Sequence, residues 1–163
     1  MQSLRTPPSD RVPRTILAVA FVAAAFAAQA GAPAAPVAVQ GAWARVVLQG
    51  QASSAAYMTL VAREPLTLTG ATSPAAGIIE IHQMKMEGDV MKMRAADTVP
   101  LPAGRPVELK PGGYHFMLMD LKAAFRADTR VPLTLQFRDA AGKPRVLQVS
   151  VPVAPAAPAG HKH

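Results

Sequence analysis

The sequence has no cysteine among its 163 residues, and only 5% of them are aromatic and 17% charged. Without cysteine the chain has no disulfide scaffold, no thiolate zinc site, no iron–sulfur ligation, no thiol nucleophile and no blue-copper centre, whose metal needs a cysteine sulfur. A lipid-modified N-terminal cysteine is excluded for the same reason. Methionine is the unusual residue that is present, because six of the eight methionines fall between Met84 and Met119.

The first 30 residues predict a secretory signal peptide. Residues 1–15 carry three arginines against one acid, the apolar run Ile16–Ala28 follows, and small residues occupy the A-x-A cleavage positions that end at Ala30. The apolar run has 13 residues, whereas a membrane-spanning helix needs about 20. We therefore expect cleavage after Ala30, export, and no stable membrane span in the mature protein. The alternative is an uncleaved anchor or a buried helix.

The charge distribution argues against a nucleic-acid partner. Without residues 1–30 the chain keeps 14 Lys and Arg against 9 Asp and Glu. These charges are scattered, and no basic run is interleaved with aromatic residues as in a nucleic-acid interface. The small positive excess fits either docking on an acidic surface or ordinary solubility.

One β-rich domain, residues 39–152, is predicted between two segments rich in alanine and proline. Residues 31–38 are interpreted as a linker and residues 153–163 as a disordered tail, since Ala and Pro without large apolar residues cannot form a core. Short runs of alternating apolar and polar residues, separated by Gly and Pro, predict an all-β Greek-key sandwich or barrel. The nine expected strands are Ala42–Leu48, Ala55–Ala62, Leu66–Gly70, Gly77–Met86, Val90–Arg94, Val107–Leu109, Tyr114–Leu121, Val131–Phe137 and Arg145–Val151.

Methionine and histidine alternate with other residues in two blocks, His82–Met93 and Tyr114–Met119. In a strand this period of two places alternate side chains on one face. If Glu87 and Gly88 form a hairpin loop, His82 lies opposite Met93 and Met84 lies opposite Met91, at Cβ separations of about 4.5–5.5 Å. An imidazole and a thioether at that separation can share one metal ion.

The second block adds two more potential ligands on one strand face. Together the blocks give the set His82, Met93, His115 and Met117. Soft thioethers select Cu(I), imidazole also suits copper, and the chemistry disfavours Zn²⁺, Ca²⁺ and Mg²⁺. The alternative is that the methionines simply pack in the core. Met84, Met91 and Met119 are expected to surround the ligands, and the sequence leaves open whether Met84 binds the metal itself. His161 and His163 form a possible weak Cu(II) site in the tail.

The chain resembles the PCu(A)C family of periplasmic copper chaperones. The spacing His82-(x10)-Met93-(x21)-His115-x-Met117 carries the resemblance, together with the words Ala42-Trp43-Ala44-Arg45, Ile81-His82-Gln83-Met84 and Leu109–His115. The resemblance implies a cupredoxin-like domain that binds one Cu(I) per chain in the periplasm. It also implies copper delivery to cytochrome oxidase subunit II or to a Sco-type protein. The chain departs from the family at Asp120, where glycine is frequent.

The expected activity is metal binding followed by ligand exchange, by a monomer and without enzymatic chemistry. Copper passes from thioethers to an acceptor that offers thiolates, the stronger soft donors. Below about pH 6 the affinity should fall, because a ligating imidazole must be neutral. The alternatives are a periplasmic copper storage or resistance protein and a metal-free exported interaction module.

Overall fold

The structure, a computed structural model, describes residues 35–157 and shows ten β-strands there and no helix. No segment of this described part has the length and hydropathy of a helix that crosses a bilayer. The strands are β1 (Val37–Arg45), β2 (Ser53–Ala62), β3 (Leu66–Thr72), β4 (Ala76–Glu87), β5 (Val90–Ala95), β6 (Val99–Leu101), β7 (Pro106–Leu109), β8 (Tyr114–Leu121), β9 (Arg130–Asp139) and β10 (Pro144–Ala154). The predicted all-β class is confirmed.

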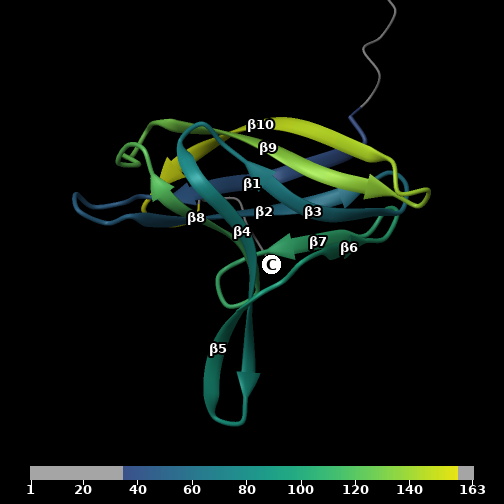
Figure 1. The fold of residues 1–163 in the computed structure, drawn as a ribbon, viewed down its shortest axis with the longest axis horizontal. Coiled ribbons are helices and arrows are strands. Elements are labelled where there is room, and N and C mark those ends of the chain that lie inside the picture. Colours follow the sequence, from purple (N-terminus) through teal and green to yellow (C-terminus); the bar gives the residue numbers. More distant parts are fainter. Residues whose placement is uncertain (1–34, 158–163) are drawn as a thin grey trace, which may run out of the picture. The chain divides into compact units, whose positions relative to one another are not determined.

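The strands form two facing sheets joined at one edge (Figure 1). They hydrogen-bond in the order β5-β4-β8-β7-β2-β1-β10-β9-β3-β6, with a further pairing between β8 and β2. Strands β1 and β10 pair in parallel and connect the two sheets, while most other pairs are antiparallel. Strands that are distant in sequence are thus neighbours, as in a sandwich whose connections cross between layers.

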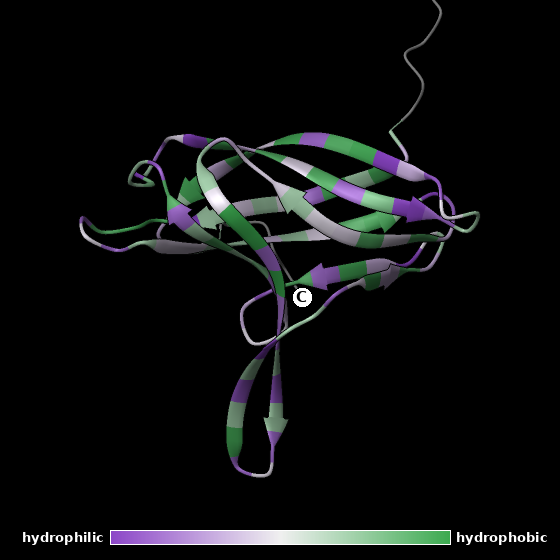
Figure 2. Ribbon diagram, in the orientation of Figure 1, coloured by the Kyte–Doolittle hydropathy of each residue, from purple (hydrophilic) through white to green (hydrophobic). Residues whose placement is uncertain are grey.

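The core lies between the two sheets and is built from inward-facing aliphatic and phenylalanine side chains. Phe116, Leu118 and Leu60 from one sheet and Phe137 and Leu135 from the other are each no more than 1% exposed. Burying each such side chain contributes about 1.5–3 kcal/mol. Outward-facing polar residues alternate with them along the strands (Figure 2), so β8 carries core residues on one face and leaves its other face for a site.

The structure extends the predicted domain at both ends and adds a strand. Strand β1 begins at Val37, inside the predicted linker, and β10 ends at Ala154, inside the predicted tail. Val37 and Val153 are 1% and 3% exposed, so burial of these two valines outweighs the Ala and Pro around them. The additional strand, β6, was not predicted because it has only three residues and a central proline. The predicted signal peptide, linker residues 31–34 and tail residues 158–163 lie outside the described part.

Strand β4 changes partners along its length, and this change positions the candidate site. Its first part, to Gln83, pairs with β8, and its last part, from His82, pairs with β5. The β4–β5 hairpin therefore continues beyond the two sheets (Figure 1), and every residue of β5 is exposed.

Candidate metal centre

His82 stands where β4 passes from one partner strand to the other. It is directly opposite His115 of β8 and, on its other side, opposite Ala95 of β5. Directly paired residues project from the same sheet face. The topology thus brings the two histidines of the two sequence blocks side by side, with their ring centroids 5.8 Å apart.

The hairpin register differs from the predicted one by two residues. Met84 pairs with Met93, and Met86 pairs with Met91. The loop is Gly88-Asp89 rather than Glu87-Gly88, because Gly88 takes a positive φ of 62° at the first loop position, a conformation that favours glycine there. A shift of two residues leaves every side chain on its original face, whereas a shift of one would have reversed them.

His82 contacts two side chains through its two ring nitrogens. Nδ1 lies 3.1 Å from the sulfur of Met93, and Nε2 lies 2.8 Å from Oε2 of Glu80. His82 and Met93 therefore meet diagonally across the strands, although they are not directly paired. With Nε2–H donating to the Glu80 carboxylate, the lone pair of Nδ1 points to the side where Met93 lies.

His115 is the deepest polar side chain of the site, with only 4% of its surface exposed. Its Nδ1 lies 3.2 Å from the carbonyl oxygen of Gly113, so Nδ1–H donates and Nε2 keeps its lone pair. Burial lowers the pKa of His115 below its ordinary value, and the nearby His82 lowers it further, while the Gly113 hydrogen bond acts in the opposite direction. The neutral imidazole, the form that binds metals, is therefore favoured.

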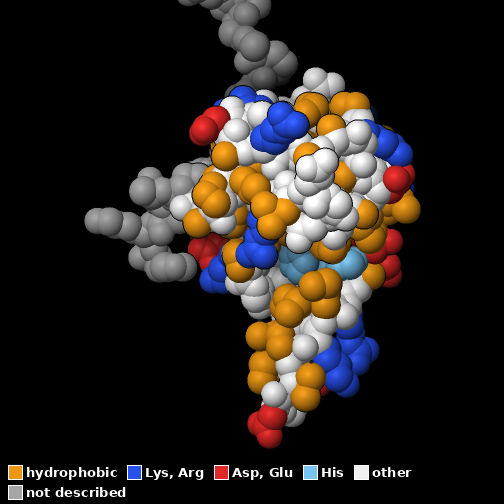
Figure 3. All heavy atoms as spheres, turned by 90° about the vertical axis from the view of Figure 1, so that its left-hand side faces the viewer, with side chains coloured by type: hydrophobic (Ala, Val, Ile, Leu, Met, Phe, Trp, Pro, Cys, Tyr) orange, Lys and Arg blue, Asp and Glu red, His pale blue; other side chains and the backbone are white. Residues whose placement is uncertain are grey.

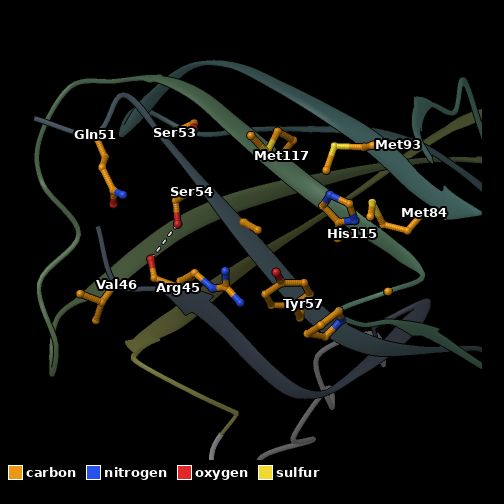
Figure 4. A pocket seen from close by; sticks show the side chains of 13 residues that line it. Arg45, Val46, Gln51, Ser53, Ser54, Tyr57, Met84, Met93, His115 and Met117 are labelled. Atoms are coloured by element: carbon orange, nitrogen blue, oxygen red, sulfur yellow. Dashed lines mark hydrogen bonds between the residues drawn. The ribbon is translucent and has the colours of Figure 1, made fainter. Parts of the chain in front are cut away.

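Met117 of β8 is the last of the four predicted ligands. It lines one open cavity of about 390 Å³ together with His115, Met84 and Met93 (Figure 4). Three of the four predicted ligands thus share this cavity, and the fourth, His82, contacts Met93 at its edge. Among the other predicted neighbours of the ligands, Met84 lines the cavity, whereas Met91 and Met119 do not.

The cavity also has a polar wall that the sequence did not reveal. Arg45, Ser54 and Gln51 line it, and the Ser54 hydroxyl donates a 2.7 Å hydrogen bond to the Arg45 carbonyl oxygen. Tyr57, which packs on Trp43 with ring centroids 4.7 Å apart, also faces His115 at 6.1 Å. Glu80 had a sequence signal in its position two residues before His82 on the same strand face.

The donors in this region are imidazole nitrogens and thioether sulfurs. Within residues 35–157, no three His, Cys, Asp or Glu side chains are close enough to hold a metal ion together. Met93 is 49% exposed and Met117 is partly buried, so both thioether side chains are more open to solvent than the enclosed His115. The histidines lie where the hairpin leaves the sheets (Figure 3). This donor set suits a soft monovalent ion better than a hard divalent one.

The domain is similar to proteins of a known family. Residues 37–153 match the family model described as "LpqE-like: Putative lipoprotein LpqE-like". The chain belongs to the LpqE-like family. Its relatives include "Putative lipoprotein Lxx21020" of Leifsonia xyli subsp. xyli, 32% identical over 72% of this chain and 69% of that protein. Another is the uncharacterized protein RP573 of Rickettsia prowazekii, 37% identical over 60% of this chain and 57% of that protein.

Solved structures similar to this member of the LpqE-like family are PCuAC domains. The solution structure of apo-DR1885 from Deinococcus radiodurans is 30% identical, with a TM-score of 0.56, covering 96% of this chain and 95% of that one. The solution structure of CuI-DR1885 is 34% identical, with a TM-score of 0.53 and coverages of 78% and 84%. The apo PCuAC domain of PmoF2 is 26% identical, with a TM-score of 0.57 and coverages of 75% and 93%. The resemblance to PCu(A)C domains and their cupredoxin-like fold is confirmed.

Proposed function

We propose that this protein binds one Cu(I) through His82, Met93, His115 and Met117 and passes it to an acceptor protein by ligand exchange. The observation that carries the proposal is the meeting of His82 Nδ1 with the Met93 sulfur at 3.1 Å, beside the paired His115. The solved relative CuI-DR1885 is described with the same ion. Two thioethers and two imidazoles match the preference of Cu(I) for soft and intermediate donors.

The hydrogen bonds around the histidines support the same assignment. Glu80 accepts from Nε2 of His82 and Gly113 accepts from Nδ1 of His115, so the nitrogens left for the ion are Nδ1 of His82 and Nε2 of His115. A carboxylate or carbonyl that accepts from the second nitrogen fixes the ring and raises its basicity as a ligand. Glu80 and Gly113 thus act as positioning groups for the two imidazoles.

The uneven burial of the site fits stepwise transfer. His115 is 4% exposed, whereas Met93 is 49% exposed. An acceptor reaches the Met93 side first, and it can replace that thioether before it displaces the buried imidazole. An acceptor with thiolates takes the ion downhill, because thiolate is the stronger soft donor. The relatives described as lipoproteins and the predicted signal peptide support a site of action outside the cytosol. We infer the periplasm as that site, and cytochrome oxidase subunit II or a Sco-type protein as the acceptor.

The binding proposal is tested by Cu(I) competition titration against a chromophoric chelator under anaerobic conditions. The wild-type protein should remove one equivalent tightly, and the His82→Ala/His115→Ala variant should lose that equivalent. The variant Met119→Leu is the control, since Met119 lies on the same face of β8 but outside the cavity. Excess Zn²⁺ should not displace the ion. Equal chelator competition by wild type and the double histidine variant would refute the assignment.

A storage or resistance protein could use the same ligands, and a transfer experiment separates the two functions. The copper-loaded protein is mixed with a thiolate-bearing acceptor domain, and the two are separated and assayed for copper. A chaperone should transfer most of its copper within minutes, whereas a storage protein should retain it. Retention with every thiolate acceptor would reject delivery while leaving the metal site intact.

A further inference from the structure

One face of the β4–β5 hairpin carries a ladder of four methionines. Only one of them, Met93, belongs to the proposed ligand set. The methionine ladder consists of Met84 opposite Met93 and Met86 opposite Met91. Directly paired residues share a face, and residues two apart on a strand share it too. The ladder therefore begins beside the two histidines and continues toward the hairpin loop.

The outer part of the ladder is not core packing. Met86 is 53% exposed and Met91 is 47% exposed, and the hairpin extends beyond the sandwich (Figure 1). Figure 3 shows hydrophobic side chains along one side of this hairpin and basic ones along the other. Exposed apolar side chains gain little from burial here, so packing does not explain two paired methionines at this distance from the core.

The opposite face of the hairpin holds the two strands in register. Glu87 forms salt bridges with Lys92 at 2.9 Å and with Arg94 at 2.6 Å. The ion pairs compensate part of the positive charge next to the ladder. The methionine pairs are thus presented side by side on a two-stranded ribbon whose pairing is supported from behind.

We infer that Met86 and Met91, with Met84 as a third thioether, form a second binding site for Cu(I). Directly opposed Cβ atoms lie about 4.5–5.5 Å apart, and each flexible methionine can turn its sulfur toward an ion between them. A site made only of thioethers selects a soft monovalent cation. The inference deepens the proposed function and rests on it, because the ladder ends beside His82 and His115.

The outer site should be the weaker of the two, since it lacks an imidazole and is open to water. Its position suits exchange with the histidine site. The pair Met86 and Met91 is the next pair along the ladder from Met84 and Met93, and an ion held there is exposed to a partner that contacts the hairpin. Copper then enters or leaves the histidine site by way of the outer sulfurs. The methionine ladder is thus the place where the ion passes between this protein and its partner.

The experiment follows the methionine methyl groups by NMR in protein labelled with [methyl-13C]methionine, titrated with Cu(I) under reducing, anaerobic conditions. The first equivalent should shift Met93 and Met117, and the second should shift Met86 and Met91. In the Met86→Leu/Met91→Leu variant the second equivalent should be lost, while the tight affinity stays within about twofold. Met119→Leu, the matched control, should keep both equivalents.

Two further outcomes separate this inference from the proposed function. In the His82→Ala/His115→Ala variant, the Met86 and Met91 signals should still shift, even though the tight equivalent is gone. Leucine keeps the apolar surface but removes the sulfur. If the ladder served only as a docking patch, wild type and the Met86→Leu/Met91→Leu variant would bind the same number of Cu(I) equivalents. Unshifted Met86 and Met91 methyl signals in the wild type at two equivalents would overturn the outer site and leave the histidine site untouched.

Discussion

Replacing Met93 by leucine is the sharpest single test of the proposed metal centre. The substitution removes the sulfur that lies 3.1 Å from His82 Nδ1 and keeps a side chain of similar volume. Because Met93 is 49% exposed and belongs to a strand that is exposed throughout, the free energy of unfolding should change by no more than about 0.5 kcal/mol. The variant therefore separates the loss of a ligand from any loss of the fold.

The expected effect on copper affinity is much larger than the effect on stability. Changing a group that only supports a ligand typically weakens metal affinity about 10- to 100-fold, and loss of a ligand itself should reach at least the upper end of that range. A 100-fold loss corresponds to about 2.8 kcal/mol. The Cu(I) dissociation constant of Met93→Leu should thus rise at least about 100-fold while its unfolding curve overlaps that of the wild type.

The assay is the anaerobic chelator competition, combined with urea denaturation of the metal-free proteins. Met119→Leu is the control, since it removes a thioether on β8 outside the cavity. Its affinity should stay within about twofold of wild type, and its stability should change by less than about 1.5 kcal/mol. If Met93→Leu and Met119→Leu bind Cu(I) equally well, the contact between His82 and Met93 does not define the metal site.

Two further predictions concern the metal-free protein. Because the pKa of His115 is lowered in the folded protein, the unfolded chain binds the proton more readily. The free energy of unfolding should therefore fall as the pH drops below about 6.5 and level off below the folded-state pKa. Urea denaturation at a series of pH values should show this fall in wild type and a smaller one in His115→Gln. A Cβ added at Gly77 would overlap Oδ2 of Asp120. This carboxylate is the end of an exposed, flexible side chain, so Gly77→Ala should cost about 1 kcal/mol, the order of one displaced rotamer, and almost nothing in an Asp120→Gly background, as measured by urea denaturation.

Each of these two predictions has an outcome that would contradict it. Identical pH slopes for wild type and His115→Gln would show that burial of the imidazole does not contribute to the acid sensitivity. An equal cost of Gly77→Ala with and without the Asp120 side chain would place the strain elsewhere. Asp120 itself has a positive φ of 52°, a conformation that glycine adopts without penalty.

Strand alternation was enough to predict most of the elements and the faces on which the candidate ligands lie. The period of two assigns His82 and Met84 to one face of their strand and His115 and Met117 to one face of theirs. The structure keeps both assignments, and the pairing of β4 with β8 makes them one sheet face. Strand β6 was not predicted because three residues around a proline give no periodic pattern. The first five residues of β1, 37–41, were not predicted because they follow an Ala- and Pro-rich segment and end at a bulge around Gly41. Their strand pairing depends on neighbours distant in sequence.

The amino-acid sequence by itself determined the donor types: two histidines and a group of methionines in a chain without cysteine, which favour a soft monovalent ion whatever the fold. Only the tertiary structure decided how they meet. It set the hairpin register by the conformation of Gly88, placed His82 against His115 by pairing β4 with β8, and brought Glu80 and Arg45 to the site region. The physical reason is that residue type fixes the chemistry of a side chain and its face on a strand, whereas partner and register depend on loop geometry and core packing across the whole domain.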